Sequence, residues 1–423
     1  MKVKIIPSTV EGSIEIPASK SMAHRAIICA SLSKGTSVIS NITYSKDIDA
    51  TIQCMEALGA AIQKNKSSCT ITGCDLQNVK DSIVCDCFES GSTLRFLIPI
   101  ASLTGKEIIF KGQGRLLARP MEIYQELFDH QSLSFIQSDD SIKIKGSLKP
   151  GAYVLKGDVS SQFISGLLFA LPLMDADSTI EILPPYESKS YVNLTISMLK
   201  QFGIQIEETS EYAYSIKGNQ QYISKDISVE GDYSQMAFFA VLGALNHTIS
   251  CHNMNPDSAQ GDKIILDFVK KAGALLDVKD STITISPDSR HGQIIDLSNC
   301  PDLGPVLCVL ASYIPSKTII THAKRLRMKE SDRIEAMECE LRKWGVDIAS
   351  TEDEIIIYGK DGYENAQEIL IQGHNDHRIV MAMTIFALCA KSPSFIEGAQ
   401  AIEKSYPDFF KDISIIQGKV EIL

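Results

Sequence analysis

Apolar segments recur at a nearly constant interval along the chain. Each of the six segments opens with small or polar residues and continues as mostly apolar positions. They start at Ser19, Ser90, Ser161, Tyr233, Asp302 and Asp376, 69 to 74 residues apart. Because these segments are apolar nearly all round, we predict that each is a buried helix.

A second series of segments lies between the first and has mixed polarity. The pattern predicts helices that end at Gly59, Gly203, Gly273 and Gly345, with further members ending at Gln131 and near Gly418. Glycine suits the left-handed conformation that ends many helices. Alternating strands such as 282–285 follow. Two series with one period predict six copies of one α/β unit of about 70 residues.

The number of copies bears on domain organisation, because six such units are too many to share one hydrophobic core. We therefore predict two lobes of three units each, divided near residues 230–232. A solenoid is the alternative for repeats of this length. The units lack a short fixed consensus and atypical capping ends, which favours two lobes.

Composition and charge argue against several classes of protein, namely those that bind nucleic acid or span or bind a membrane. The 423 residues are 44% hydrophobic and 22% charged, as in globular proteins, and the net charge of −11 argues against nucleic acid or anionic membranes as partners. The longest apolar run, 379–390, is shorter than the roughly 20 residues of a membrane span. We see no signal peptide and no regular cysteine framework, so we expect a cytoplasmic protein with reduced thiols.

Candidate chemistry gathers at the starts of the buried helices. Four of these starts carry hydroxyl, amide or cationic side chains, at residues 19–25, 90–95, 160–162 and 375–378. Helix N-termini bind anions, and Lys and Arg add full charge. Taken singly, each start is more typical of an ordinary helix cap. Together they predict one anion-binding surface, provided that the helices pack in parallel.

Three charged loops, 112–120, 324–333 and 403–408, fit the same interpretation. The chain has no Walker A sequence, no dinucleotide-binding glycine fingerprint and no nucleophile elbow, which disfavours ATP, NAD and serine-hydrolase chemistry. His374 and His377 are spaced like metal ligands, but no third ligand is in pattern. We therefore favour capping and anion contact for them, and predict no metal.

Several of these motifs occur in an order that resembles a known family. They are residues 20–25 (KSMAHR), 90–95 (SGSTLR), 119–120 (RP), 160–163 (SSQF), 188–191 (SKSY), 329–333 (KESDR), 376–378 (DHR) and 404 (K). The chain resembles the 5-enolpyruvylshikimate-3-phosphate synthases over essentially its whole length. The resemblance implies an α/β fold of two lobes, each with three βαβαββ repeats. The lobes would comprise residues 1–19 plus 231–423 (phosphoenolpyruvate side) and 20–230 (shikimate 3-phosphate side).

The resemblance also implies a reaction. The enolpyruvyl group of phosphoenolpyruvate would move to the 5-hydroxyl of shikimate 3-phosphate through a tetrahedral intermediate, releasing phosphate. No cofactor is implied, and the partners are these small anions. We expect a cytoplasmic monomer whose lobes close on the ligand.

Residue roles are carried over from the family one by one. The implied ligands of shikimate 3-phosphate are Ser21, Arg25, Ser160, Ser161, Gln162, Ser188, Tyr191, Asp302 and Lys329. Those of phosphoenolpyruvate are Lys20, Gly91, Arg119, Gln162, Arg333, Arg378 and Lys404. Asp302 would take the 5-hydroxyl proton, and Glu330 would deliver the proton to C3, with Lys20 as the rival acid–base group.

Departures from the family pattern occur at Glu89, Phe96 and Arg325, all bordering the implied phosphoenolpyruvate pocket. Two alternative functions are kept. One is UDP-N-acetylglucosamine enolpyruvyl transfer, although Gly114 stands where that family typically has a reactive cysteine. The other is a non-catalytic anion-binding protein, which would not need Asp302 and Glu330.

Overall fold

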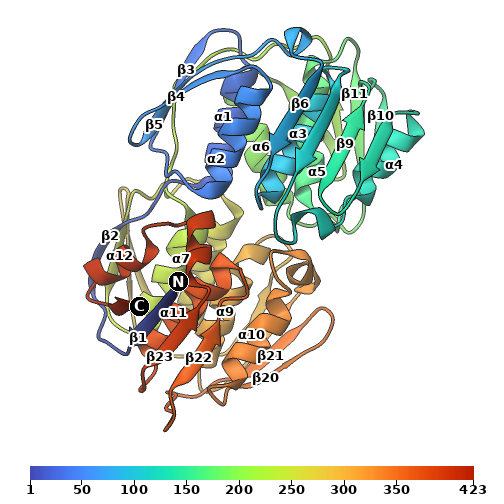
Figure 1. Ribbon diagram of the computed structural model, residues 1–423. Helices are drawn as coiled ribbons and strands as arrows, with labels where there is room; N and C mark the ends of the chain where they lie inside the picture. The colour runs from blue at the N-terminus through green and yellow to red at the C-terminus, as the bar shows by residue number, and fades with distance from the viewer. The chain divides into compact units, whose positions relative to one another are not determined.

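The computed structural model describes residues 1–423, which form two compact units. Unit 1 comprises Met1–Ser19 and Glu230–Leu423, and unit 2 comprises Lys20–Val229. Each unit holds three four-stranded sheets. Within each unit the apolar helices lie in the interior and the sheets lie around them (Figure 1). The predicted six-repeat α/β fold is confirmed, with three repeats in each unit.

Unit 2 contains the first three repeats. The first repeat consists of α1 (Lys20–Leu32), β3 (Thr36–Ser40), α2 (Lys46–Ala57), β4 (Ala61–Lys64), β5 (Ser68–Thr72) and β14 (Ile227–Ser228). The second consists of β6 (Ser82–Asp86), α3 (Gly91–Ser102), β7 (Glu107–Lys111), α4 (Glu122–His130), β8 (Ser134–Gln137) and β9 (Ser141–Lys145). The third consists of β10 (Ala152–Lys156), α5 (Ser161–Ala170), β11 (Ser178–Leu183), α6 (Lys189–Gln201), β12 (Ile206–Ser210) and β13 (Ala213–Ile216).

Unit 1 contains the other three repeats and the start of the chain. One repeat consists of β2 (Gly12–Glu15), α7 (Tyr233–Leu245), β15 (Ile249–His252), α8 (Ile265–Lys271), β16 (Leu275–Lys279) and β17 (Thr282–Ser286). The next consists of β18 (Ile294–Asp296), α9 (Gly304–Ser312), β19 (Lys317–Thr321), α10 (Arg333–Arg342), β20 (Asp347–Ser350) and β21 (Ile355–Tyr358). The last consists of β22 (Ile369–Gln372), α11 (His377–Cys389), β23 (Ser394–Glu397), α12 (Phe409–Ile415), β24 (Lys419–Ile422) and β1 (Lys2–Ile6).

All six sheets share one topology. In each, one edge strand pairs in parallel with its neighbour and the remaining pairs are antiparallel, as in β6-β7-β9-β8. Three repeats include a strand from a distant part of the chain. The strand β14 pairs in parallel with β3, β2 pairs in parallel with β15, and β1 lies between β23 and β24. Three sheets are therefore completed only by strands from a far part of the sequence.

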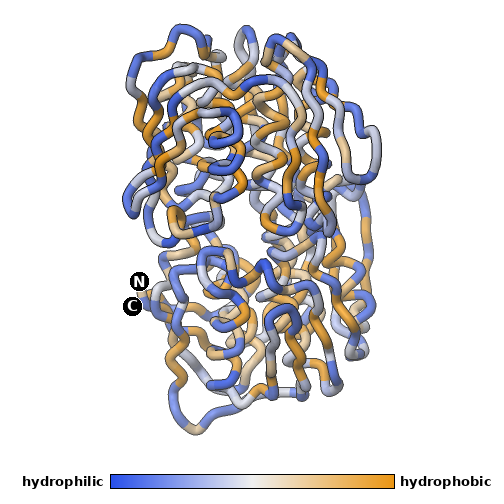
Figure 2. Tube along the Cα trace, turned by 90° about the vertical axis from the view of Figure 1, so that its right-hand side faces the viewer, coloured by the Kyte–Doolittle hydropathy of each residue, from blue (hydrophilic) through white to orange (hydrophobic).

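The hydrophobic core of each unit follows from the predicted apolar segments. In unit 1, the helices α7, α9 and α11 pack against one another, and in unit 2, α3 packs on α5 while α1 packs on α2 and α6. Every residue of α7 is buried, as is nearly all of α11. The trace in Figure 2 is hydrophobic through the interior of each unit and mostly hydrophilic at the turns. No helix is long and apolar enough to span a membrane.

Most of the predicted helix stops have the expected conformation. Gly59, Gly203, Gly273 and Gly345 have φ values from 73° to 109°. The stop near Gly418 differs, because Gln417 takes the left-handed conformation instead, with φ 67°. After Gln131, Ser132 does the same with φ 56°. The backbone of the repeated unit therefore requires a left-handed residue after this helix even where the sequence has no glycine.

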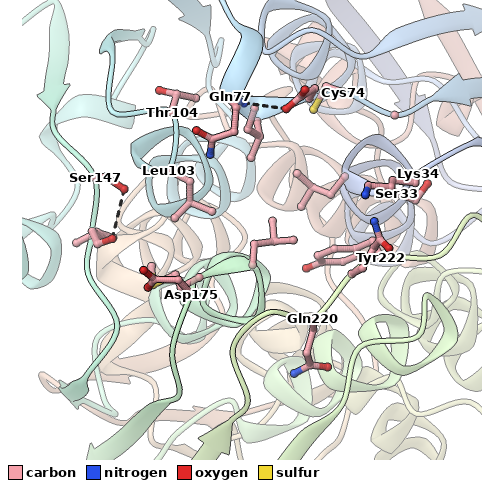
Figure 3. Close-up of a pocket in the computed structure, with 18 of the residues that line it drawn as sticks. Ser33, Lys34, Cys74, Gln77, Leu103, Thr104, Ser147, Asp175, Gln220 and Tyr222 are labelled. Carbon is pink, nitrogen blue, oxygen red and sulfur yellow. Dashed lines mark hydrogen bonds between the residues drawn. The ribbon is translucent and has the colours of Figure 1, made fainter.

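One pocket of about 1200 Å³ opens in unit 2 where the core helices end (Figure 3). Leu32 is the last residue of α1, Leu103 follows α3 and Leu173 lies beyond α5, and all three line this pocket. The helices α1, α3 and α5 of unit 2 thus have their C-termini around this pocket. None of the predicted site residues lines it.

Candidate functional site

The predicted site residues of unit 2 lie at the starts of its helices, away from this pocket. Ser90 caps α3 by accepting a hydrogen bond from the amide of Thr93, and Ser160 caps α5 by accepting one from Gln162. Ser188 precedes α6 in a left-handed conformation, with φ 55°. Small polar residues therefore stand where helix amides are available to an anion.

Arg25 is the most tightly held cation of this group. Its Nε donates to Thr195 Oγ1 at 2.8 Å, and its two Nη atoms donate to the carbonyls of Ser21 at 2.7 Å and Tyr191 at 3.0 Å. Its guanidinium lies over the ring of Phe96, 5.1 Å from the centroid. Burial lowers the pKa of Arg25 to about 10, so it stays charged at neutral pH. Phe96, one of the departures from the family pattern, therefore supports a predicted substrate ligand.

Gln162, Gly91 and Arg119 form a second group, and Arg95 organises it. Arg95 Nη1 donates to Gln162 Oε1 at 2.9 Å, and Gln162 Nε2 donates to Ser92 Oγ at 3.0 Å. A Cβ on Gly91 would lie 2.9 Å from Arg119 Nη1. Glycine at this position thus lets Arg119 approach the start of α3.

A buried chain of hydrogen bonds links α1, α2 and α3 behind these residues. His24 Nδ1 lies 2.7 Å from Thr51 Oγ1, which lies 2.6 Å from Thr93 Oγ1, and Thr93 donates to Ser90 Oγ at 2.7 Å. Since Thr93 gives its proton to Ser90, Thr51 donates to Thr93 and His24 donates from Nδ1. Burial, with Lys20 and Arg25 nearby, holds the pKa of His24 well below its usual value, so the ring is neutral.

Lys20, the predicted rival acid–base group, begins α1. Its Nζ donates to Asp47 Oδ2 at 2.7 Å, and both side chains are mostly buried. The sequence pattern did not single out Asp47, which lies in the first turn of α2. This ion pair keeps the ammonium at one place beside the start of the helix.

The predicted residues of unit 1 form one network of charges around Arg333. Its side chain is 1% exposed and donates to Asp302 at 3.2 Å, to Glu330 at 2.6 Å and to Asp376 at 2.8 Å. Asp376 also caps α11 by accepting from the amide of Arg378. One guanidinium therefore joins the segments that precede α9, α10 and α11.

Asp302 is surrounded by cations. Its Oδ1 lies 3.2 Å from Lys329 Nζ and 3.2 Å from Arg333 Nη1, and its Oδ2 accepts from Arg378 Nη2 at 3.0 Å. Burial alone would raise the pKa of Asp302, but the charges of Arg378, Lys329 and Arg333 outweigh it and hold that pKa well below the usual value. Asp302 is therefore ionised, and its oxygens are already engaged.

Lys404 and His374 lie at the loop before α11. Lys404 is buried and donates to the carbonyl of Asn375 at 2.6 Å. His374 Nε2 lies 2.8 Å from Glu340 Oε1, so this histidine has a carboxylate partner on α10. Both contacts fix the turn that leads to Asp376 and Arg378.

The structure thus brings the predicted residues together within each unit. In unit 1 the starts of three core helices meet, since Arg378 of α11 bonds Asp302 before α9 and Ser234 of α7. Sequence reasoning missed Ser234, Asp262 and Asp47 as parts of these networks, and used Arg95 and Asp376 only as cluster members. Asp262, which accepts a hydrogen bond from Ser234, lies in the 3-10 turn Gly261–Ile264 and has no periodic signal in the sequence.

Comparison with known proteins identifies the family. The model of the EPSP synthase (3-phosphoshikimate 1-carboxyvinyltransferase) family matches residues 5–413. The chain belongs to the EPSP synthase family. The 3-phosphoshikimate 1-carboxyvinyltransferase of Clostridium kluyveri is 45% identical over 99% of this chain and 98% of its own length. That of Clostridioides difficile is 41% identical over the same shares. The predicted family is confirmed.

Solved structures agree with this membership in the EPSP synthase family. An EPSP synthase from Acinetobacter baumannii has a TM-score of 0.79 and 25% identity, and the match covers 99% of both chains. The enolpyruvyl transferase NikO from Streptomyces tendae has a TM-score of 0.80 at 14% identity, over 99% of this chain and 98% of that one. This second likeness concerns the fold alone.

Proposed function

We propose that this chain transfers the enolpyruvyl group of phosphoenolpyruvate to the 5-hydroxyl of shikimate 3-phosphate and releases phosphate, as a transferase of the shikimate pathway. The observation that carries the proposal is the likeness, at 41–45% identity over nearly full length, to relatives named for this reaction. The charged networks of both units agree with two anionic substrates.

The residues of unit 2 are assigned mainly to shikimate 3-phosphate. Arg25 supplies charge, while Ser160, Ser161 and Ser188 supply hydroxyls at helix starts, where free amides also attract a phosphate. The assignment is completed by Ser21, Gln162 and Tyr191, together with Asp302 and Lys329 of unit 1.

Phosphoenolpyruvate is assigned to residues of both units, five of which are cationic. Arg333, Arg378 and Lys404 belong to unit 1, and Lys20, Gly91, Arg119 and Gln162 belong to unit 2. Charge-assisted hydrogen bonds contribute about 1.5–3 kcal/mol each, so several together can offset the repulsion between two anions. We also keep the division that the resemblance implies, with unit 1 as the phosphoenolpyruvate side and unit 2 as the shikimate 3-phosphate side.

The chemistry begins at Asp302 and Glu330. Asp302 takes the proton of the 5-hydroxyl as that oxygen bonds to C2, and Glu330 protonates C3, which gives the tetrahedral intermediate. Glu330 then recovers a proton from C3 as the C2–O bond to phosphate breaks and the double bond re-forms; Lys20 is the rival for this role.

The ion pairs of Asp302 suggest how its basicity is controlled. Three cations hold its pKa low, so it is a weak base. The carboxylate and phosphate of phosphoenolpyruvate would compete for Arg333 and Arg378. As these cations turn to the substrate, the pKa of Asp302 rises.

A phosphate-release assay tests the function. Phosphoenolpyruvate with shikimate 3-phosphate should release phosphate, and phosphoenolpyruvate with UDP-N-acetylglucosamine should release none. Release of phosphate only with UDP-N-acetylglucosamine would contradict the proposal. Release with neither pair would indicate a non-catalytic anion-binding protein. Gly114 argues against the second pair, because it stands where the UDP-N-acetylglucosamine enolpyruvyl transferases typically have a reactive cysteine.

We further propose that the protein works as a cytoplasmic monomer. Light scattering coupled to gel filtration should give a mass near 46.4 kDa, and twice that mass would contradict a monomer.

A further inference from the structure

Two buried polar residues outside the predicted set hold Arg378. Arg378 Nη2 donates to Ser234 Oγ at 2.8 Å, and Ser234 donates to Asp262 Oδ2 at 2.5 Å. The exposed fractions are 4% for Arg378, 7% for Ser234 and 4% for Asp262. The guanidinium therefore has a second anchor besides Asp302.

The direction of these two hydrogen bonds is fixed by proton counting. A serine hydroxyl has one proton, and an ionised carboxylate can only accept. Ser234 therefore donates to Asp262, and its lone pair faces the guanidinium, which has only donors. Because the three groups are buried, these bonds act in a low dielectric and hold their geometry strongly.

Asp262 owes its position to the fold rather than to Arg378. The preceding Gln260 accepts from the amide of Tyr233 at 3.2 Å and donates to the carbonyl of Gly231 at 2.8 Å. Asp262 also lies in the 3-10 turn Gly261–Ile264, which contacts α7. The segment 260–262 is thus fastened to the start of α7, the helix that carries Ser234.

We propose that Asp262 and Ser234 are positioning residues that keep the guanidinium of Arg378 oriented for phosphoenolpyruvate. This inference rests on the proposed role of Arg378. Asp302 is the other anchor, but its hold weakens when the substrate draws Arg378 or when Asp302 takes a proton. The bond to Ser234 involves neither event and persists through the reaction.

A positioning role and a purely electrostatic role of Asp262 predict opposite changes in the KM for phosphoenolpyruvate when Asp262 is replaced by Asn. Removing a negative charge near a site for an anion should strengthen phosphoenolpyruvate binding if only the field matters. If Asp262 acts by orienting Ser234, the amide accepts the hydroxyl proton less strongly, Arg378 is held less well, and the KM for phosphoenolpyruvate rises. The sign of the change in KM therefore decides between the two.

The experiment compares steady-state kinetics of Asp262→Asn, Ser234→Ala and the double variant of the full chain. We expect the KM for phosphoenolpyruvate to rise roughly tenfold in Ser234→Ala and severalfold in Asp262→Asn, while the KM for shikimate 3-phosphate changes less than about twofold. The double variant should resemble Ser234→Ala, because both changes break one chain of bonds. Ser312→Ala is the matched control, since it removes a buried hydroxyl at the C-terminal end of α9.

Three results would overturn the inference. The first is an unchanged or lowered KM for phosphoenolpyruvate in both single variants. The second is an equal rise in the KM for phosphoenolpyruvate and the KM for shikimate 3-phosphate. The third is a rise in the KM for phosphoenolpyruvate in Ser312→Ala as large as in Ser234→Ala. Arg378→Ala distinguishes this failure from failure of the proposed role. If Arg378→Ala leaves the KM for phosphoenolpyruvate unchanged, the assignment of Arg378 is wrong; if it raises that KM and the other variants do not, only the positioning inference fails.

Discussion

Replacement of Arg333 by lysine tests the charge network of unit 1 most directly. Lysine keeps the positive charge but replaces a planar fork by one nitrogen. Arg333 makes four hydrogen bonds to carboxylates, at 2.6, 2.8, 3.2 and 3.2 Å, from three different nitrogens. A single ammonium cannot reach all of these oxygens, so buried carboxylates lose partners.

The size of the effect follows from these contacts. A hydrogen bond between charged groups contributes about 1.5–3 kcal/mol, and removal of one member of a buried ion pair costs about 3–5 kcal/mol. Because lysine keeps the charge and some contacts, we expect Arg333→Lys to lose about 3 kcal/mol in the free energy of unfolding. That loss is smaller than the stability of typical domains, so the variant should still fold.

The chain offers a local probe for this measurement. Trp344 is the only tryptophan, is 2% exposed and follows α10, the helix that begins with Arg333. Urea unfolding followed by its fluorescence therefore reports on unit 1. Arg342→Lys is the control, since the Arg342 side chain lies on α10 and is 58% exposed.

The control should unfold within about 0.5 kcal/mol of the parent. An Arg333→Lys variant with the parent's urea midpoint would refute the idea that the guanidinium fork holds the three carboxylates together. Loss of stability without a rise in the KM for phosphoenolpyruvate would leave Arg333 as a structural residue and contradict its assignment as a ligand.

Three further predictions concern both units. Glu330→Gln should cut kcat by about 10²–10⁴-fold with little change in either KM, whereas Glu335→Gln on α10 should not; unchanged turnover removes Glu330 from the mechanism. Gly91→Ala should raise the KM for phosphoenolpyruvate roughly tenfold, since its Cβ would lie 2.9 Å from Arg119 Nη1, and an unaltered KM would show that Arg119 need not lie there. His24, whose folded pKa is depressed, contributes stability that is present above its unfolded pKa of about 6.5 and is lost as pH falls below it. Urea unfolding should therefore lose about 1 kcal/mol between pH 6.5 and 5.5, and His24→Asn should lose less; equal losses would contradict a buried neutral ring.

The local features of this protein could be predicted from its sequence. The caps at Ser90, Ser160 and Asp376 and the left-handed glycines at four helix ends are decided by neighbouring residues, so the pattern along the chain was sufficient. The same holds for the six apolar helices, because an all-round apolar segment must be buried. The family resemblance then supplied the roles that we propose for the site residues.

Tertiary structure decided which side chains meet. Arg378 and Asp302 are 76 positions apart and Arg378 and Ser234 are 144 apart, and nothing in the local pattern of either residue names its partner. Ser132 and Gln417 end helices without glycine, since the shape of the repeat outweighs the preference of a single residue. Periodicity and capping are short-range effects that a sequence displays directly. The pairing of buried charges depends on how helices from different repeats pack, and this packing also leaves Asp262 next to Ser234.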